Sequence, residues 1–403
     1  MINAKMVKPR IFPWNSDRNP SQIDRLQEIS GDLALNRDKI YEIGRVSLLG
    51  YRKRTPTLTG RLRQFENGSM DFWYDLANKE TPGSGDGHSV KEIDMETTIT
   101  DITTYLTDDN DDFTGSIRFP RLRLAGFTIN VGDPDAMVER NFNVVSEGYD
   151  YLKDNYFSYQ KKTALADADL TVVLSPVPVE YAAGDYIFRV LRVRGSVATV
   201  LSAGIGDDNW SYVNGTHTLT VNDCLIGDIV KVYFASATAY ETIWTDNNSD
   251  ANVLLAEYCE IYMKIGTSER IYRLQSLGID VTFERTDYKE IGNNENVQEG
   301  VKQVTTKISL NRFVEGMTFE QILADNETYP YLNPDDFSDN IQMIVKIFGE
   351  KEHTNFKIGY LMNKISPTAV GNSQVIQDYL KATVALEADN FLVSDLESEI
   401  VFA

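Results

Sequence analysis

The stretch LQEISGDLALNRDKIYEIG at residues 26–44 returns in altered form as LQSLGIDVTFERTDYKEIG at residues 274–292. The two stretches align without a gap, 248 positions apart, and both end in EIG. The similarity then continues at the same spacing. The identical pairs along it include Leu26/Leu274, Asp32/Asp280, Arg37/Arg285, Thr57/Thr305, Leu62/Leu310 and Phe65/Phe313. Repeats of this kind indicate the architecture of the whole chain, so we expect a tandem duplication of one domain.

The ends of the two copies are also alike. After a deletion of one residue, LA at 76–77 meets LA at 323–324. The first copy closes with VVSEGYDYL (144–152) and the second with VALEADNFL (384–392), which pairs Val144 with Val384 and Leu152 with Leu392.

Composition indicates a folded chain with more than one domain. It has 403 residues, 42% hydrophobic and 11% aromatic, enough for two or three cores. No apolar run approaches the length of a membrane span, and the N-terminus has no apolar segment typical of a secretory signal. Cys224 and Cys259 are too few for a disulfide framework and favour small buried residues in a reducing cytosol.

The net charge of −21 argues against a surface that grips nucleic acid, because tight binding to phosphates rests on many Lys and Arg contacts. The simplest interpretation is that the charge keeps the protein soluble. An acidic surface is also suited to DNA that must slide past without binding.

The repeated stretch reads as a half-buried strand, since apolar and polar residues alternate in it. We expect Leu33, Leu35, Val281 and Phe283 to face a core. Second strands are predicted at 57–65 and 305–313. The segments between the strands, 44–56 and 292–304, exceed the length that a hairpin turn needs and are predicted to be long functional loops.

A change of period after the second strand predicts one short helix in each copy, at 69–78 and 317–326. Ser69 is a candidate N-cap, and Thr318 with Gln321 fits a capping box. Further strands are predicted at 115–132, 142–152, 340–349, 355–365 and 379–388. Each copy is therefore predicted to be a β-sandwich with a single helix.

Residues from about 160 to 243 have no counterpart in the repeat. Short apolar runs separated by Gly, Pro and Asn-Asp turns predict a small independent β-sandwich, immunoglobulin-like in class although the Cys-Trp-Cys pattern is missing. The predicted domains are 1–155, 160–243 and 250–403.

Motifs for catalysis or metal binding are weak. PGSGDGH (82–88) does not lie between a strand and a helix, which favours a flexible loop over a phosphate site. DDNDD (108–112) has Phe113 where a calcium loop needs Gly, so a solvated acidic turn is favoured. The three histidines are scattered, without metal-ligand spacing. We therefore expect no enzyme activity, no metal and no cofactor.

The repeated unit, carried by YEIGRVSLLGYRKRTPTLTGRLRQFENGSMDFWYDLA (41–77) and YKEIGNNENVQEGVKQVTTKISLNRFVEGMTFEQILA (288–324), resembles the tail tube (major tail) proteins of long-tailed bacteriophages and related archaeal viruses. The resemblance covers roughly 1–152 and 250–403. It implies six tube domains per ring, sheets that join into a barrel around a DNA channel, and a long loop that reaches the next ring. A duplicated chain would fill six positions with three subunits, a homotrimeric and pseudo-hexameric ring.

The resemblance also implies the role of particular residues. The face of the first strand opposite the apolar positions would line the channel: Asp32, Asn36, Asp280, Thr282 and Glu284. The two long loops would contact adjacent rings through Arg45, Leu48, Leu49, Tyr51, Arg52, Lys53, Arg54, Glu295, Glu299 and Lys302. The first loop is basic and the second mainly acidic.

The partners that the resemblance implies are further copies of the chain, tape measure and tail completion proteins, and DNA that passes without specific binding; no membrane is expected. The protein would be assembled in the host cytoplasm and reside in the virion tail. Two alternatives remain. A host-surface or adhesion β-sandwich protein would need a signal peptide or anchor, and a glycan-active enzyme would need a carboxylate pair in an aromatic cleft.

Overall fold

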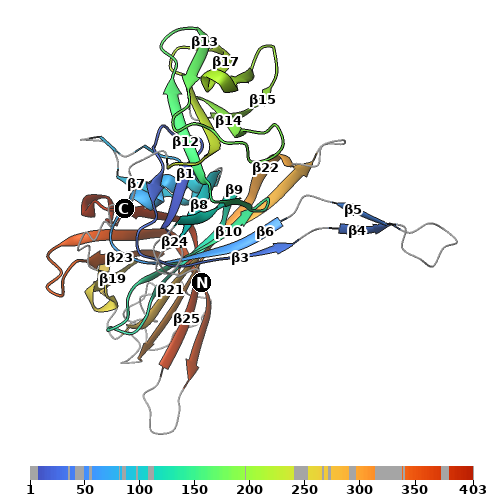
Figure 1. The fold of residues 1–403 in the computed structure, drawn as a ribbon. Helices are drawn as coiled ribbons and strands as arrows, with labels where there is room; N and C mark the ends of the chain where they lie inside the picture. Colours follow the sequence, from blue (N-terminus) through green and yellow to red (C-terminus); the bar gives the residue numbers. More distant parts are fainter. Residues whose placement is uncertain are drawn as a thin grey trace.

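The computed structural model describes residues 8–34, 37–40, 50–53, 57–80, 82–83, 88–96, 99–107, 113–195, 197–239, 253–265, 267–270, 274–289, 296–313, 338, 341–373 and 381–402. Within them the chain is mainly β, with one short α-helix, α1 (Asp71–Leu76). The strands form a 16-stranded sheet that curls into a half-barrel, a seven-stranded sheet and the two-stranded ladder of β4 (Arg37–Ile40) and β5 (Gly50–Lys53) (Figure 1).

The large sheet contains strands from both halves of the chain. The first half contributes β1 (Lys8–Pro13), β2 (Ser21–Gln22), β3 (Leu26–Ala34), β6 (Thr57–Phe65), β7 (Ser89–Lys91), β8 (Thr100–Thr107), β9 (Phe113–Val131), β10 (Glu139–Ser146) and β11 (Asp150–Lys153). The second half contributes β19 (Cys259–Ile265), β20 (Thr267–Arg270), β21 (Leu274–Lys289), β22 (Asn296–Phe313), β23 (Ile341–Phe348), β24 (Phe356–Ser373) and β25 (Lys381–Ser394).

Strand order is the same in the two halves. The first runs β2-β1-β8-β9-β10-β6-β3 and the second β20-β19-β23-β24-β25-β22-β21. The hairpin registers also agree: Ile29 lies opposite Leu62, and Leu277 lies opposite Leu310, each 248 positions later. The gapless spacing of the repeated stretch is therefore kept in the hydrogen-bonding pattern.

Irregularities in the ladders recur at matching positions. The register shifts at Ala125, where β9 passes β10, and at Thr368, where β24 passes β25. A second shift lies between Thr100 and Ile102 in β8 and between Ile341 and Met343 in β23. Since bulges are specific features of a strand pair, they relate β9 to β24 by 243 positions.

Near the end of each half, the sequence alignment of the two copies differs from the hydrogen-bond register. Val144 lies opposite Gly60, whereas Val384 lies opposite Leu310. Hydrogen-bond register thus relates Val144 to Leu386, an offset of 242, and the pairing of Val144 with Val384 inferred from sequence is shifted by two residues. The shift preserves the face of the strand.

The halves are joined by a direct ladder between β9 and β21, in which Ile129 lies opposite Ile279. Eight strands therefore form one continuous curved surface in the order β3-β6-β10-β9-β21-β22-β25-β24. Among the described strands, β3 pairs only with β6, and the part of β24 after Ser366 pairs only with β25.

One apolar core crosses the junction between the halves. Trp73 of α1 packs against Phe127 and Phe142 of the first half and against Phe391 of the second, with ring centroids 5.2, 5.4 and 6.2 Å away. Just beyond α1, β7 pairs with β25 through Val90 and Val393. The first half thus contributes a helix and a strand to the second.

The seven-stranded sheet lies between the halves in sequence and projects from the half-barrel (Figure 1). Its strands are β12 (Tyr156–Thr163), β13 (Ala168–Val173), β14 (Ile187–Arg194), β15 (Val197–Ala203), β16 (Asn209–Val213), β17 (Thr218–Cys224) and β18 (Ile229–Ser236). Because β15 pairs with β14 on one edge and with β16 on the other, the sheet is continuous. Leu170 and Leu219 at one end of this sheet share a buried core with Val190 and Val232 at the other, so the sheet folds back over its own core. The immunoglobulin-like class stays a prediction.

A second core attaches this sheet to the first half. Phe12 and Trp14 pack with Phe157, Tyr159 and Tyr233. Buried charges lie beside it, and Asp101 accepts hydrogen bonds from Arg118 and Trp14. The Lys231 ammonium donates to the carbonyl oxygens of Pro13 and Ser16.

Several sequence predictions are met. The strand at 57–65 is β6, and Val281 and Phe283 are buried in the core. The predicted helix at 69–78 contains α1, but Met70 rather than Ser69 is its N-cap. The Ser69 hydroxyl instead accepts a bond from the Asp71 backbone N–H. The helix predicted at 317–326 lies outside the described residues.

The predicted long loops are wrong in part. Residues 292–304 are mostly strand, because β22 begins at Asn296 and pairs with the far end of β21. In the first half, β5 occupies 50–53 and pairs with β4, so Tyr51, Arg52 and Lys53 are strand residues. The segment predicted as one strand at 142–152 forms two, β10 and β11.

Candidate functional site: the concave face and its arm

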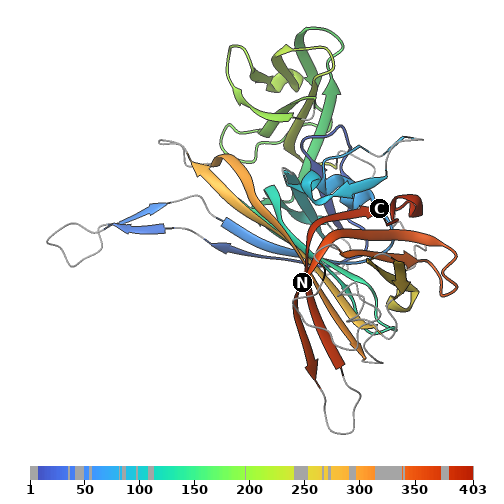
Figure 2. The ribbon, with the colours of Figure 1, turned by 180° about the vertical axis from the view of Figure 1, so that it is seen from behind.

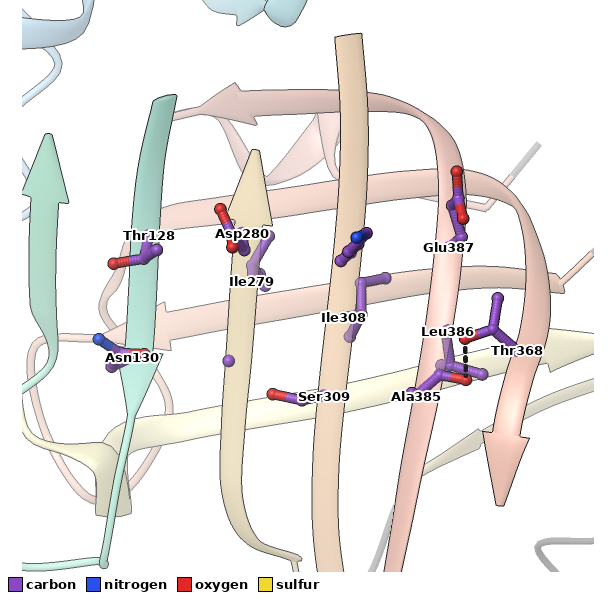
Figure 3. A pocket seen from close by; sticks show the side chains of 12 residues that line it. Thr128, Asn130, Ile279, Asp280, Ile308, Ser309, Thr368, Ala385, Leu386 and Glu387 are labelled. Atoms are coloured by element: carbon purple, nitrogen blue, oxygen red, sulfur yellow. Dashed lines mark hydrogen bonds between the residues drawn. The ribbon is translucent and has the colours of Figure 1, made fainter. Parts of the chain in front are cut away.

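A hollow on the described surface follows the concave side of the large sheet. It has a volume of about 630 Å³ and crosses β9, β21, β22, β25 and β24 (Figure 3). Figure 3 shows Thr128 and Asn130 on β9 beside Asp280 on β21, with Ser309 and Glu387 on the next strands. The Thr368 hydroxyl donates to the Ala385 carbonyl at its edge.

Alternation along the strands places these polar residues together. Thr306, Ile308 and Leu310 of β22 are buried, so Lys307 and Ser309 between them face the other side. In the ladder, Lys307 lies opposite Asp280 on one side and opposite Glu387 on the other. One cation therefore lies between two carboxylates in a single row across the concave face.

The five channel residues predicted from sequence have different outcomes. Asp280 lines the hollow, and Thr282 is exposed with its hydroxyl 3.4 Å from the Asp280 carboxylate. Glu284 is exposed and forms an ion pair of 3.0 Å with Lys302. Asp32 is exposed on β3, and Asn36 lies outside the described residues.

The ion pair Glu284–Lys302 connects a residue predicted to line the channel with a residue predicted to lie in an inter-ring loop. The register shift between Glu284 and Arg285 explains it, because Lys302 is the extra residue in β22 at that point. Arg285 turns the other way and donates to the carbonyl oxygens of Leu124 and Glu96.

Basic residues of the first half lie on the same side of the sheet as Thr59, away from buried Leu58 and Leu62. Arg63 pairs with Glu139, and Arg61 donates to Asn141 at 2.8 Å. Each of these guanidinium groups therefore has a partner on β10.

The β4–β5 ladder forms an arm that extends far from the half-barrel (Figure 2). Arg52 of β5 lies opposite Asp38 of β4, and Lys53 opposite Arg37. Tyr51 also lies in β5. Of the other predicted contact residues, Glu299 is in β22 opposite Asp287. Arg45, Leu48, Leu49, Arg54 and Glu295 lie outside the described residues.

Residues of the concave face that the sequence did not single out include Thr128, Asn130, Lys307, Ser309, Thr368 and Glu387. The signal for Lys307 and Ser309 was present in the alternation of TTKISLNRF. Thr128 and Asn130 also alternate with buried Phe127, Ile129 and Val131, but their place beside Asp280 depends on the ladder between the two halves.

The described residues contain no group of three or more His, Cys, Asp or Glu placed to hold a metal ion. His88 pairs with Asp395 and His353 with Glu260, so both histidines have carboxylate partners. Likewise, none of the described helices is both long and apolar enough to span a bilayer. Cys224 and Cys259 are free thiols.

Among the buried groups with displaced pKa values, Asp75 and Lys231 both lie away from the concave face. Burial raises the pKa of Asp75 to about 6, against the lowering effect of Arg18 and Ser21. Burial lowers the pKa of Lys231 to about 7, with Lys161 acting in the same direction. Asp75 of α1 accepts hydrogen bonds from Arg18 and Ser21, and Lys231 of β18 donates to the carbonyl oxygens of Pro13 and Ser16, so each group connects its element to the segment around β1 and β2.

Comparison with known proteins gives structural matches only. No protein-family model matches the chain, and no curated protein matches it. The sheath-tube complex of PVC, an extracellular contractile injection system, matches with 13% identity over 38% of this chain and 100% of that chain, with a TM-score of 0.29. The SPP1 tail tube matches with 11% identity over 37% and 86%, at 0.28. The tube-terminating cap of the anti-feeding prophage matches with 13% identity over 34% and 88%, at 0.25.

Proposed function

We propose that this protein is the structural subunit of a viral tail tube, a conduit through which viral DNA passes during ejection. The observation that carries the proposal is the shared strand order and register of the two halves, together with the ladder that joins β9 to β21. A duplicated unit whose copies pair edge to edge has the property that a ring requires, because the same contact can recur between chains.

The free edges support ring formation. In the repeat, β3 corresponds to β21 and β24 corresponds to β9. The unpaired edge of β3 therefore matches the edge of β21 that pairs with β9, and the end of β24 matches the part of β9 that pairs with β21. If the internal junction recurs between chains, β24 of one copy pairs with β3 of the next. Closure leaves no edge strand exposed to aggregation. In the proteins that the sequence resembles, six tube domains complete a ring, so three chains suffice here.

The proposed domains follow from the correspondence between the two halves of the chain. Residues 1–155 and 250–403 are two tube domains, and 160–243 form a third domain on the outside of the tube. The contact of the inserted sheet with β1 supports this position, because Phe12 and Trp14 lie off the concave face. A ring closed by six domains leaves no space for it in the wall.

The concave face is the wall of the channel in this proposal. It is polar, and the cation Lys307 lies between two carboxylates. DNA therefore meets few unpaired positive charges and passes without specific binding. No cofactor or enzyme activity is required.

Stacking of rings is assigned to the arm and to the end of the β21–β22 hairpin. The arm carries Arg52 and Lys53 in β5, and the hairpin end carries Glu299. In the virion tail, tape measure and tail completion proteins are the further partners, and assembly takes place in the host cytoplasm.

Electron microscopy of the purified chain tests the proposal directly. The expected result is rings or tubes with threefold symmetry and six similar lobes around a channel. A ring of six whole chains would contradict the stoichiometry. Fibres would favour the alternative, a host-surface or adhesion protein, and monodisperse monomers at high concentration would favour the glycan-active enzyme.

A further inference from the structure

An aromatic and aliphatic surface lies exposed on the outside of the first half. It comprises Tyr149 and Tyr151, which are 49% and 52% exposed, with Ile117 and Phe119 of β9 beside them. We refer to these four residues as the tyrosine face. Tyr151 lies opposite Ile117 in the β9–β11 ladder, and among the described strands β11 pairs with β9 alone.

The second half contains the equivalent surface in a covered state. The offset of 243 matches Ile117 and Phe119 with Tyr360 and Met362, and the offset of 242 matches Tyr149 and Tyr151 with Phe391 and Val393. All four matched side chains are 0% exposed. The β24–β25 ladder confirms the match, since Val393 lies opposite Tyr360 as Tyr151 lies opposite Ile117.

Two elements of the first half produce this cover. Trp73 of α1 packs against Phe391, and β7 adds a strand to the edge of β25 through Val90 and Val393. Within one chain, then, the helix and following strand of one half close the surface of the next half. Among the described residues, no helix or strand covers the surface of the first half in this way.

We propose that the tyrosine face binds a second copy of this chain, through the segment that corresponds to α1 and β7. That segment is residues 318–332, and this inference rests on the proposed ring. Its sequence repeats that of 71–82 with an offset of 247: TFEQILADNETY against DFWYDLANKETP. Phe72, Leu76, Ala77, Glu80 and Thr81 recur as Phe319, Leu323, Ala324, Glu327 and Thr328.

The chemistry of the internal junction gives an independent argument. There a polar triad is fully buried: Glu66 accepts a 2.6 Å bond from the Tyr360 hydroxyl, and Arg140 lies 3.2 Å from its carboxylate. A triad of this kind is stable only when all members are present, because each would otherwise be left unpaired in the core.

At the second junction all three members are replaced by apolar residues. Val314 stands 248 positions after Glu66, Ala382 stands 242 after Arg140, and Ile117 stands 243 before Tyr360. Ala382 and Val314 belong to one half of the chain, whereas Ile117 belongs to the tyrosine face of the other. Ile117 has no polar group that could pair with a buried charge. If it contacts the second half of another copy, the residues there that match Glu66 and Arg140 must also be apolar, as Val314 and Ala382 are.

Disulfide cross-linking tests the contact. Val90 lies ten residues before Thr100, the start of β8, and Tyr331 lies ten residues before Ile341, the start of β23. The internal pair Val90–Val393 thus predicts that Tyr331 of one copy meets Tyr151 of another. The double variant Tyr151→Cys/Tyr331→Cys should form covalent trimers under oxidation, whereas either single variant should stay monomeric on a non-reducing gel.

The outcomes separate this inference from the proposed function. Rings in electron micrographs without cross-linked trimers would overturn the docking contact but would still support the proposed tail-tube function. Absence of rings from the wild-type chain would overturn both. Cross-linked trimers within rings would support both.

A second variant measures the energetic contribution of the face. Tyr149→Ser/Tyr151→Ser should raise the concentration needed for ring assembly at least tenfold, while the unfolding transition of the subunit stays in place because both side chains are half exposed. The matched control is Val197→Ser/Val200→Ser on β15, whose side chains are 64% and 51% exposed. An unchanged assembly threshold in the tyrosine variant would overturn the inference.

Discussion

The hydroxyl of Tyr360 donates a hydrogen bond of 2.6 Å to Glu66, although 294 residues separate the two in sequence. Both side chains are fully buried, and Arg140 lies 3.2 Å from the same carboxylate. Burial, followed by the charge of Glu66, raises the pKa of Tyr360 well above its usual value, so the hydroxyl stays protonated and remains a donor. The two halves of the chain are therefore connected by a neutral donor, a carboxylate and a guanidinium.

Two substitutions in this triad should differ in their effect on stability. Tyr360→Phe removes one hydrogen bond and leaves Glu66 paired with Arg140, so the free energy of unfolding should fall by about 1–2 kcal/mol. Glu66→Leu leaves the Arg140 charge buried without its carboxylate and should lower it by about 3–5 kcal/mol. Chemical denaturation of both variants measures the order, and equal losses would contradict the proposed division of roles.

The buried Lys231 predicts a pH dependence of stability. Its pKa falls from the ordinary value of 10.5 to about 7, first through burial and then through Lys161; Asp17, Glu80 and Asp75 oppose the shift. Between pH 7 and pH 10.5 the unfolded chain binds a proton that the folded chain lacks. The contribution of this group to stability therefore rises with pH across that interval and is flat below it.

The measurement is the free energy of unfolding at pH 7 and pH 9 for the wild-type chain and for Lys231→Met. The wild-type chain should gain about 2–3 kcal/mol over the variant between the two pH values, from about 1.4 kcal/mol per pKa unit. The comparison cancels other titrating groups, which both chains share. Parallel pH profiles would show that Lys231 is not the titrating group.

The sequence predicts a strand well where its buried and exposed positions appear as alternating apolar and polar residues. The hairpin strands were predictable, because Val281 and Phe283 are buried while their neighbours Asp280 and Thr282 are exposed. Strand β8 was missed, because Thr100, Asp101, Thr103 and Thr104 are polar and yet buried. Asp101 tolerates burial since Arg118 and Trp14 donate to its carboxylate, a contact that sequence patterns do not reveal.

The candidate site was predictable only where it rests on one hairpin. The alternation in β21 identified Asp280, and the same argument applied to β22 would have identified Lys307. Thr128 and Asn130 join them through pairing between the halves, which a single sequence does not encode locally. The tyrosine face was hidden for the same reason, since its meaning depends on what covers Phe391 and Val393 in the other half.

The seam between neighbouring copies has a predicted register. In the internal junction Phe127 lies opposite Val281. Applying the offsets of 243 and 248 places Val370 of β24 opposite Leu33 of β3 in the next copy. Opposite residues in antiparallel strands are close enough for a disulfide, so Leu33→Cys/Val370→Cys should yield covalent trimers on oxidation.

The matched control for the seam is Leu33→Cys/Ala369→Cys, in which the second cysteine points to the other face of β24. It should give little cross-linking in rings that look normal. Stronger cross-linking in the control would show that the register between copies differs by one residue from the internal junction.

The concave face should control whether tubes retain DNA. Asp280 and Glu387 both lie opposite Lys307 in the ladder. Asp280→Lys/Glu387→Lys replaces two negative charges by two positive ones in each copy, and positive charge along a channel binds phosphates. Variant tubes should retain short DNA at low salt and release it steeply as salt rises, whereas wild-type tubes should not retain it. Equal retention by both tubes, measured by co-sedimentation, would place the channel on another surface.

The arm offers a test of how rings stack. Arg52 and Lys53 lie in β5, on a ladder that extends away from the half-barrel, and Arg54 follows them in sequence. A basic arm is unusual in a chain of net charge −21, and it suits contact with carboxylates of an adjacent ring. Each exposed ion pair contributes only about 0.2–1 kcal/mol, but a ring of three chains makes every contact three times.

Arg52→Glu/Lys53→Glu/Arg54→Glu should therefore leave the subunit folded and single rings intact, but shorten or abolish tubes. The matched control, Lys153→Glu/Lys162→Glu/Lys351→Glu, changes the net charge equally at exposed positions away from the arm. Because both variants gain the same negative charge, any difference in tube length reflects the arm itself and not general repulsion between rings. Tube lengths in electron micrographs at fixed protein concentration and salt measure it. Tubes of normal length from the arm variant would exclude these three residues from the contact between rings.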